Sequence, residues 1–129
     1  MQYNLSNIYN PELPACLNDF LNYLGTIRGK SKNTQDGYQV DLTMLFRFLK
    51  IYRGMVKENY EFEDIDISDI STDFIRKITL SDLYAFISFT ENYRNNGNYA
   101  RARKVACLKS FFKYLFSKAK LIDANPALE

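Results

Sequence analysis

The sequence contains no histidine and no tryptophan among its 129 residues. Without histidine, the chain cannot carry a Ser-His-Asp or Cys-His catalytic arrangement, and it has no imidazole with which to bind a metal ion. It lacks any run of about 18 apolar residues, the length that spans a bilayer. Its N-terminus has neither the basic start nor the apolar stretch of a signal peptide. These absences predict a cytoplasmic protein with no metal site, no cofactor and no membrane segment.

Glycine, proline and cysteine are all scarce, at five, three and two residues. So little glycine and proline excludes a loop-rich or disordered chain. Hydrophobic residues make up 47% and charged residues 25%, as in a globular domain. A chain of this length buries a core large enough to fold without disulfide bonds. Cys16 and Cys107 each lie in a helix-patterned stretch, so we expect two reduced thiols in the core.

The net charge is only +2, but the two signs are segregated along the chain. The stretch 58–73 carries seven acidic residues and no basic one, and the stretch 94–122 carries eight basic residues and no acidic one. The basic residues are Arg94, Arg101, Arg103, Lys104, Lys109, Lys113, Lys118 and Lys120. A near-neutral total therefore conceals a strongly basic C-terminal third.

Apolar residues recur at helical spacing almost everywhere, which predicts an all-α chain. We expect helices over 12–28, 32–53 and 99–120, and another that opens at Thr79 and ends before Asn95. The first and last links between these helices are short, whereas the middle link is long. Four main helices connected in this way form a small bundle.

Capping and turn residues support these boundaries. They are Asn10 and Pro11 at the start of the first helix, Gly29 at its end, Ser31 before the second helix, Thr79 with Asp82 as a capping box, and Asn95 to Asn98 as a turn. The second helix carries apolar residues on two flanks, so we expect it to be buried on two sides. The second flank consists of Val40, Met44, Phe48 and Ile51. Tyr84 and Phe116 are expected on the inner faces of the last two helices.

The acidic stretch 58–73 interrupts the helical pattern, and we expect a long, solvated connection whose isoleucines turn inward. A calcium-binding loop is the alternative for so many carboxylates. Such a loop needs glycine at its sixth position and a carboxylate at its twelfth. Counting from Asp64 gives Asp69 and Ile75, so the sequence does not support a calcium loop.

The basic helix 99–120 separates into two faces when its residues are placed at about 100° each. One sector is apolar, and the opposite sector holds Arg103, Ala106, Lys109, Ser110, Lys113 and Ser117. That outer sector contains no carboxylate to pair with its cations. Such a face suits a DNA major groove, where cations meet phosphates or guanine edges and small residues allow close approach. The alternative interpretation is the solvated face of an ordinary helix.

The start of the second helix has a similar character. Cations, amides and hydroxyls gather at Lys30, Lys32, Asn33, Thr34 and Gln35. Unpaired backbone N–H groups and the helix dipole favour a phosphate at such a position. Helix capping and solubility explain the same residues without a ligand.

Three segments follow one known pattern. Residues 31–42 match S-x-x-T-x-x-x-Y-x-x-D-L, which Phe46-Arg47-Phe48-Leu49 continues. Residues 101–115 are similar to R-x-L-S-A-L-R-x-F-Y-x-Y-L, and residues 122–127 are similar to I-x-x-N-P-A. In this order, the segments resemble the N-terminal domain of the tyrosine recombinases, the family of phage integrases and Xer-type resolvases. The acidic connection is longer than in the compact resolvases.

The resemblance implies a core-binding domain over residues 1–127, folded as a SAM-like four-helix orthogonal bundle that grips one face of a DNA site. The last residues, Leu128 and Glu129, are then expected to be vector-derived. The resemblance also implies that the nucleophilic tyrosine belongs to a catalytic domain outside this chain. We therefore assign no catalytic residue and expect no enzymatic activity. Double-stranded DNA and other recombinase protomers are the implied partners.

The residues expected to contact DNA lie at the start of the second helix and along the last one. They are Lys30, Lys32, Asn33, Thr34, Gln35, Gln39, Thr43, Asn98, Tyr99, Arg101, Arg103, Lys104, Lys109, Ser110 and Lys113. We expect them to share one surface, with the acidic stretch turned away from it. An all-α protein-interaction domain whose basic face binds an acidic partner remains the alternative.

Overall fold

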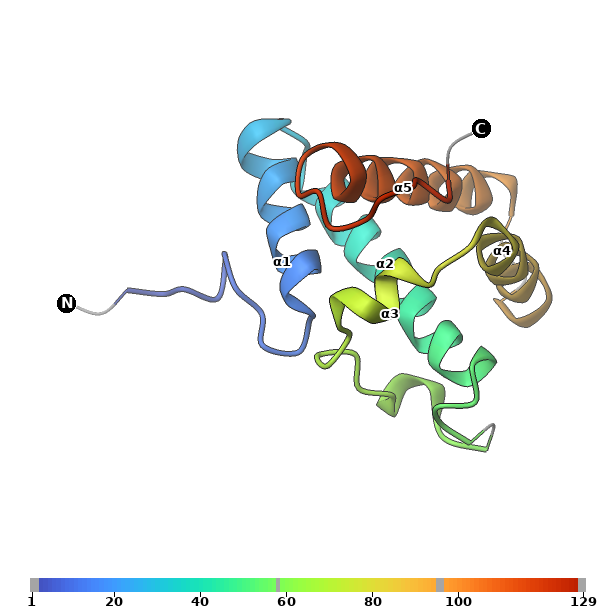
Figure 1. Cartoon of the computed structure of the whole chain (residues 1–129). Coiled ribbons are helices and arrows are strands. Elements are labelled where there is room, and N and C mark those ends of the chain that lie inside the picture. Colours follow the sequence, from blue (N-terminus) through green and yellow to red (C-terminus); the bar gives the residue numbers. More distant parts are fainter. Residues whose placement is uncertain (1–2, 58, 95–96, 128–129) are drawn as a thin grey trace.

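The computed structural model describes residues 3–57, 59–94 and 97–127. Within these ranges it contains helices and no strand, which confirms the all-α prediction. The elements are α1 (Ala15–Asn22), the π-helical turn η1 (Tyr23–Ile27), α2 (Lys32–Tyr52), the 3₁₀ turn η2 (Phe62–Asp64), α3 (Thr72–Arg76), α4 (Leu80–Arg94) and α5 (Asn98–Ser117). In Figure 1, α2 runs through the middle of the molecule, with α1 on the left, α5 across the top and α4 on the right. No helix in the described ranges is long and apolar enough to cross a membrane.

The central helix is α2, which packs against α1, α4 and α5. Ser31 precedes it, and its Oγ accepts a hydrogen bond from the backbone N–H of Thr34 at 3.1 Å, which confirms the predicted cap. Leu42, Leu45 and Leu49 of α2 are fully buried. Each buried leucine stabilises the fold by about 1.5–3 kcal/mol. The α2 helix is therefore the element on which the other helices are positioned.

The α1 helix begins at Ala15, later than the predicted start at residue 12 after the Asn10 cap. The buried side chain of Asn18 explains the difference. Its Oδ1 accepts a hydrogen bond from the backbone N–H of Asn10 (2.8 Å), and its Nδ2 donates to the Asn10 carbonyl (3.0 Å). These bonds hold the preceding residues in a non-helical turn. The helical stretch ends through η1 before Gly29, which has the predicted stop conformation with φ of +63°.

The acidic connection between α2 and α4 lies folded against α2. Ile65, Ile67 and Ile70 are buried, which confirms that the isoleucines turn inward. Lys50 of α2 holds the connection in place, because its Nζ donates to Asp69 Oδ1 and to the backbone carbonyl of Asp66, both at 2.6 Å. In the part of the chain that the structure describes, no group of three or more His, Cys, Asp or Glu residues could hold a metal ion.

Side-chain caps mark the two helices that follow the acidic residues. The short helix α3 was not predicted, because five residues are too few for a periodic pattern. Ser71 caps it by accepting a hydrogen bond from the backbone N–H of Phe74 at 3.2 Å. The predicted capping box of α4 is confirmed, with Thr79 N to Asp82 Oδ2 at 2.9 Å and Asp82 N to Thr79 Oγ1 at 3.2 Å. Half of the predicted turn before α5, at Asn95 and the residue after it, lies outside the described residues.

Both cysteines are buried free thiols, as predicted. Burial raises the pKa of Cys16 to about 12 and raises the pKa of Cys107 well above its ordinary value. Since the thiolate is the reactive form of cysteine, both side chains act as packing groups at neutral pH.

Candidate nucleic-acid interface

One face of α5 is exposed and carries lysines. We define the α5 outer face as Ala102, Ala106, Lys109, Lys113 and Ser117, all of which are exposed. Neither Lys109 nor Lys113 has a carboxylate partner among the described residues. The small side chains beside the two lysines allow a ligand to approach the helix closely, and the two ammonium groups can meet phosphates.

At its inner edge, α5 is tied to α2 by an ion cluster that consists of buried Asp41, buried Lys104 and half-buried Arg103. Arg103 donates through Nε to Asp41 Oδ2 (3.0 Å) and through Nη2 to Asp41 Oδ1 (2.7 Å). Lys104 Nζ lies 3.3 Å from the same Oδ1. The Asp41 carboxylate raises the pKa of Arg103. Arg103 therefore does have a carboxylate partner, contrary to the prediction for the outer sector of this helix.

Lys104 is 3% exposed, so the prediction that it contacts DNA is wrong. The buried stripe of α5 includes Lys104 because this residue lies four positions before Leu108 and seven before Phe111. Cys107 is also fully buried, whereas Phe116, which was predicted to face the core, is 44% exposed. The buried sector is thus rotated toward the ion cluster. The position of Lys104 within an apolar stripe of α5 was the sequence signal for a buried carboxylate on the helix that packs against it.

Beside the ion cluster, exposed residues of α2 and α5 meet where the two helices approach each other. A Cβ atom on Gly37 would lie only 3.5 Å from Arg103 Cδ. Asn33 and Val40 flank Gly37 on the same face of α2, and Val40 is 56% exposed although its flank was predicted to be buried. Tyr99, one turn before Arg103, is 84% exposed. We call these five residues the α2–α5 crossing. Gly37 and Val40 were not among the predicted contact residues, because neither carries a polar side-chain group.

The predicted residues at the start of α2 are partly engaged with one another. Lys32 forms an exposed ion pair with Asp36 at 3.1 Å. Gln35 donates through Nε2 to the backbone carbonyl of Lys30 at 3.1 Å, and Thr34 takes part in the Ser31 cap. The Lys30 ammonium is exposed and has no ion-pair partner in the described ranges. Helix capping and local hydrogen bonds therefore account for Thr34 and Gln35, whereas Lys30 is exposed without an ion-pair partner in the described ranges.

Gln39 and Thr43 lie on the side of α2 that faces away from α5. Each is two residues from Asp41, which places it about 200° around the helix axis from the ion cluster. Both line a hollow together with Glu63 and Asp66 of the acidic connection. The prediction that they share one surface with the outer lysines of α5 is therefore wrong. A helical wheel of α2 places Gln39 and Thr43 opposite Asp41. The wheel alone does not show which of these sides packs against α5.

At the start of α5, two predicted residues bind each other and α4. Arg101 forms an ion pair with Glu91 of α4. Asn98 Oδ1 accepts a hydrogen bond from Arg101 Nη2 at 2.7 Å. These contacts position the N-terminal turn of α5, and the Glu91 carboxylate offsets the positive charge of Arg101. Ser110, further along the helix, is half-buried at the edge of the α5 outer face.

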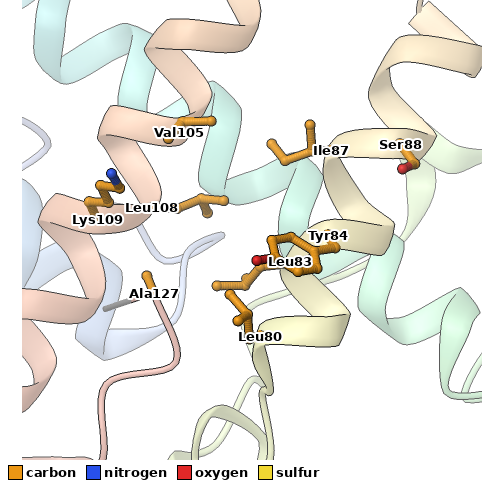
Figure 2. Close-up of a pocket in the computed structure, with 9 residues that line it drawn as sticks. All are labelled: Leu80, Leu83, Tyr84, Ile87, Ser88, Val105, Leu108, Lys109 and Ala127. Atoms are coloured by element: carbon orange, nitrogen blue, oxygen red, sulfur yellow. The ribbon is translucent and has the colours of Figure 1, made fainter. Parts of the chain in front are cut away.

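An apolar hollow of about 430 Å³ lies between α4, α5 and the C-terminal segment, and its lining residues are drawn in Figure 2. Its lining consists of Leu80, Leu83, Tyr84, Ile87, Ser88, Val105, Leu108, Lys109 and Ala127. Tyr84 was predicted to face the core, but it is 57% exposed at this hollow. The lining is mostly apolar and contains no carboxylate, so the hollow offers a packing surface and no pair of acid and base groups.

The comparison with known families agrees with this architecture. The model of the phage integrase N-terminal SAM-like domain matches residues 17–119. The chain belongs to this family. The matched part of this SAM-like domain runs from α1 through α5, so it contains the α5 outer face, the ion cluster and the α2–α5 crossing.

Three relatives of the SAM-like domain carry the name tyrosine recombinase. XerC of Caldanaerobacter subterraneus subsp. tengcongensis is 50% identical over 116 residues, 90% of this chain and 33% of that protein. XerD of Listeria monocytogenes serotype 4b is 30% identical over 107 residues, 81% of this chain and 29% of that protein. XerC of Leptospira interrogans serovar Lai is 26% identical over 110 residues, 85% of this chain and 29% of that protein. These matches confirm the resemblance that the three sequence segments indicated.

The SAM-like domain chain spans about a third of the length of the curated relatives that it matches. No solved structure matches the chain.

Proposed function

We propose that this SAM-like domain is the DNA-binding domain of a site-specific tyrosine recombinase and that it binds duplex DNA through the α5 outer face and the α2–α5 crossing. The observation that carries the proposal is the pair Lys109 and Lys113. They stand one helical turn apart on an exposed face of small residues, and neither has a carboxylate partner in the described ranges. The names of the relatives support the same function.

The proposed interface divides the work among residue types. Lys109 and Lys113 contact phosphates, while the alanines beside them allow the helix to approach the groove. At the α2–α5 crossing, Asn33 can hydrogen-bond to base edges, and exposed Val40 can contact a thymine methyl group. The acidic connection is bound to the C-terminal half of α2 through Lys50, so its carboxylates lie away from the α5 outer face.

Binding to duplex DNA should depend steeply on salt. An interface with about four phosphate contacts predicts a slope of about −3 to −4 for the logarithm of the association constant against the logarithm of salt concentration. Fluorescence anisotropy with a short mixed-sequence duplex at several salt concentrations measures this slope. A duplex affinity that does not change with salt would contradict the proposal. Preference for an acidic protein over excess duplex would instead support the protein-interaction alternative.

The remaining steps of recombination are proposed for parts of the protein outside these 129 residues. Because the chain covers about a third of its relatives, we propose that a further domain supplies the nucleophilic tyrosine and grips the opposite face of the DNA. Other protomers would bind the same site beside it. For a protein with this role, we propose a cytoplasmic location.

The isolated chain should neither nick nor join DNA. It has no histidine, and none of its described residues forms a metal-binding group that could activate a phosphodiester. Incubation with supercoiled plasmids, followed by denaturing electrophoresis, should show no nicked circles and no covalent protein–DNA product. A full-length recombinase on its own site is the positive control. Covalent product from the pure chain would place a nucleophile within it.

A further inference from the structure

The buried ion cluster is unbalanced in charge. It contains one carboxylate, Asp41, and two cations, Arg103 and Lys104. Asp41 is fully buried and Lys104 is 3% exposed. The neighbouring thiol, Cys107, has a raised pKa and is neutral at pH 7, so it does not offset the surplus. Asp41 can balance only one of the two cations, so the cluster keeps one positive charge in excess, and an anion that reaches it from solvent is attracted.

The surplus charge has one route to solvent, which is the open edge of Arg103. Its Nε and Nη2 donate to Asp41, while its Nη1 has no hydrogen-bond partner in the described part of the chain. The Arg103 side chain is 36% exposed. Gly37 lies beside this edge, since a Cβ there would sit 3.6 Å from Nη1. The absence of a side chain on Gly37 leaves room over the guanidinium for a tetrahedral anion.

We propose that Arg103, over the gap at Gly37, is the seat of one phosphate of the DNA backbone, and that buried Lys104 acts as its positioning residue. This proposal rests on the proposed DNA-binding function. Arg103 contacts the phosphate through its outer edge while Asp41 fixes the plane of the guanidinium from within. Lys104 shares the Asp41 carboxylate, so Asp41 does not neutralise Arg103. A residue that cannot touch DNA therefore contributes to DNA affinity.

The test compares two buried lysines. Lys104→Met removes the cation behind Arg103, and Lys50→Met removes a cation that is also buried but binds Asp69 in the acidic connection. Both variants change the net charge by the same amount. In anisotropy titrations of the 129-residue chain with a mixed-sequence duplex, Lys104→Met should weaken binding about tenfold near 0.1 M salt and make the salt slope less steep by about one. Lys50→Met should stay within about twofold of the parent.

A second variant tests the seat without changing a charge or the core. Gly37→Leu places a side chain over the open edge of Arg103 at a helix position that tolerates leucine. This variant should also weaken binding about tenfold and make the salt slope less steep by about one. Circular dichroism melting curves show that each variant is folded.

The outcomes separate this inference from the function on which it rests. A parent chain that does not bind the duplex would overturn both. A parent that binds, with Lys104→Met and Gly37→Leu unchanged in affinity and slope, would overturn the phosphate seat alone. Equal losses from Lys104→Met and Lys50→Met, with Gly37→Leu unchanged, would also overturn it, because net charge would then explain the result.

Discussion

The double variant Lys109→Glu/Lys113→Glu should bind duplex DNA about 100-fold more weakly than the parent chain near 0.1 M salt. Each lysine that releases counterions from one phosphate is worth about tenfold at this salt concentration, and each glutamate adds repulsion. The free energy of unfolding should change by no more than about 0.5 kcal/mol, because both side chains are exposed. Anisotropy titrations and melting curves of the same preparations measure both quantities.

The matched control is Lys57→Glu/Lys77→Glu, which makes the same change in net charge at exposed positions between α2 and α4. Its affinity should remain within about threefold of the parent, since long-range repulsion is screened over about 10 Å. If the control loses as much affinity as the α5 variant, only overall charge matters. If the folded α5 variant binds as well as the parent, the α5 outer face is a solvated surface and the proposed interface is elsewhere.

Asp41→Ala should lower the free energy of unfolding by about 3–5 kcal/mol, because it removes the carboxylate of a buried ion pair. The variant leaves the Lys104 ammonium buried without its carboxylate, and it removes both hydrogen bonds from Arg103. Urea unfolding followed by circular dichroism measures the change. The loss is a large fraction of the total stability of about 5–15 kcal/mol that is typical of a domain.

Asp69→Ala is the control, because Asp69 also pairs with a buried lysine, Lys50. Its carboxylate is 64% exposed, and Lys50 keeps the carbonyl of Asp66 as a partner at 2.6 Å. We expect a loss of about 1 kcal/mol or less. The double variant Asp41→Ala/Lys104→Met should recover part of the Asp41→Ala loss, since the ion cluster then holds no buried ammonium. Equal effects of the two aspartates, or no recovery in the double variant, would show that the ion cluster is not the cause.

The elements that sequence predicts well are those that local residues determine. The start of α2 at Ser31 and the Thr79–Asp82 box of α4 depend on hydrogen bonds that span three residues. The inward isoleucines of the acidic connection follow from apolar residues that have to leave water. The family resemblance also depends on short segments, and it predicted the all-α bundle and the family together.

The features that sequence did not predict depend on contacts between distant residues. Asp41 and Arg103 are 62 positions apart, so neither helix alone shows that a carboxylate and two cations meet. The late start of α1 depends on Asn18, whose side chain reaches back to residue 10. The side of α2 on which Gln39 and Thr43 lie depends on which stripe packs against α5. In each case, a helix pattern defines faces but does not say which neighbour covers them.

The ion cluster also determines how α2 and α5 are aligned lengthwise. Two helices with apolar stripes can slip past each other by one turn, about 5.4 Å, and keep leucines in contact. In this pair, a slip of one turn along α5 would bring Cys107 and Leu108 to Asp41 and leave a carboxylate and an ammonium buried apart. The free-energy cost of separating Asp41 from Lys104 therefore disfavours any other register of the two helices. The lengthwise offset between Asn33 on α2 and Lys109 on α5 is therefore fixed before any ligand binds.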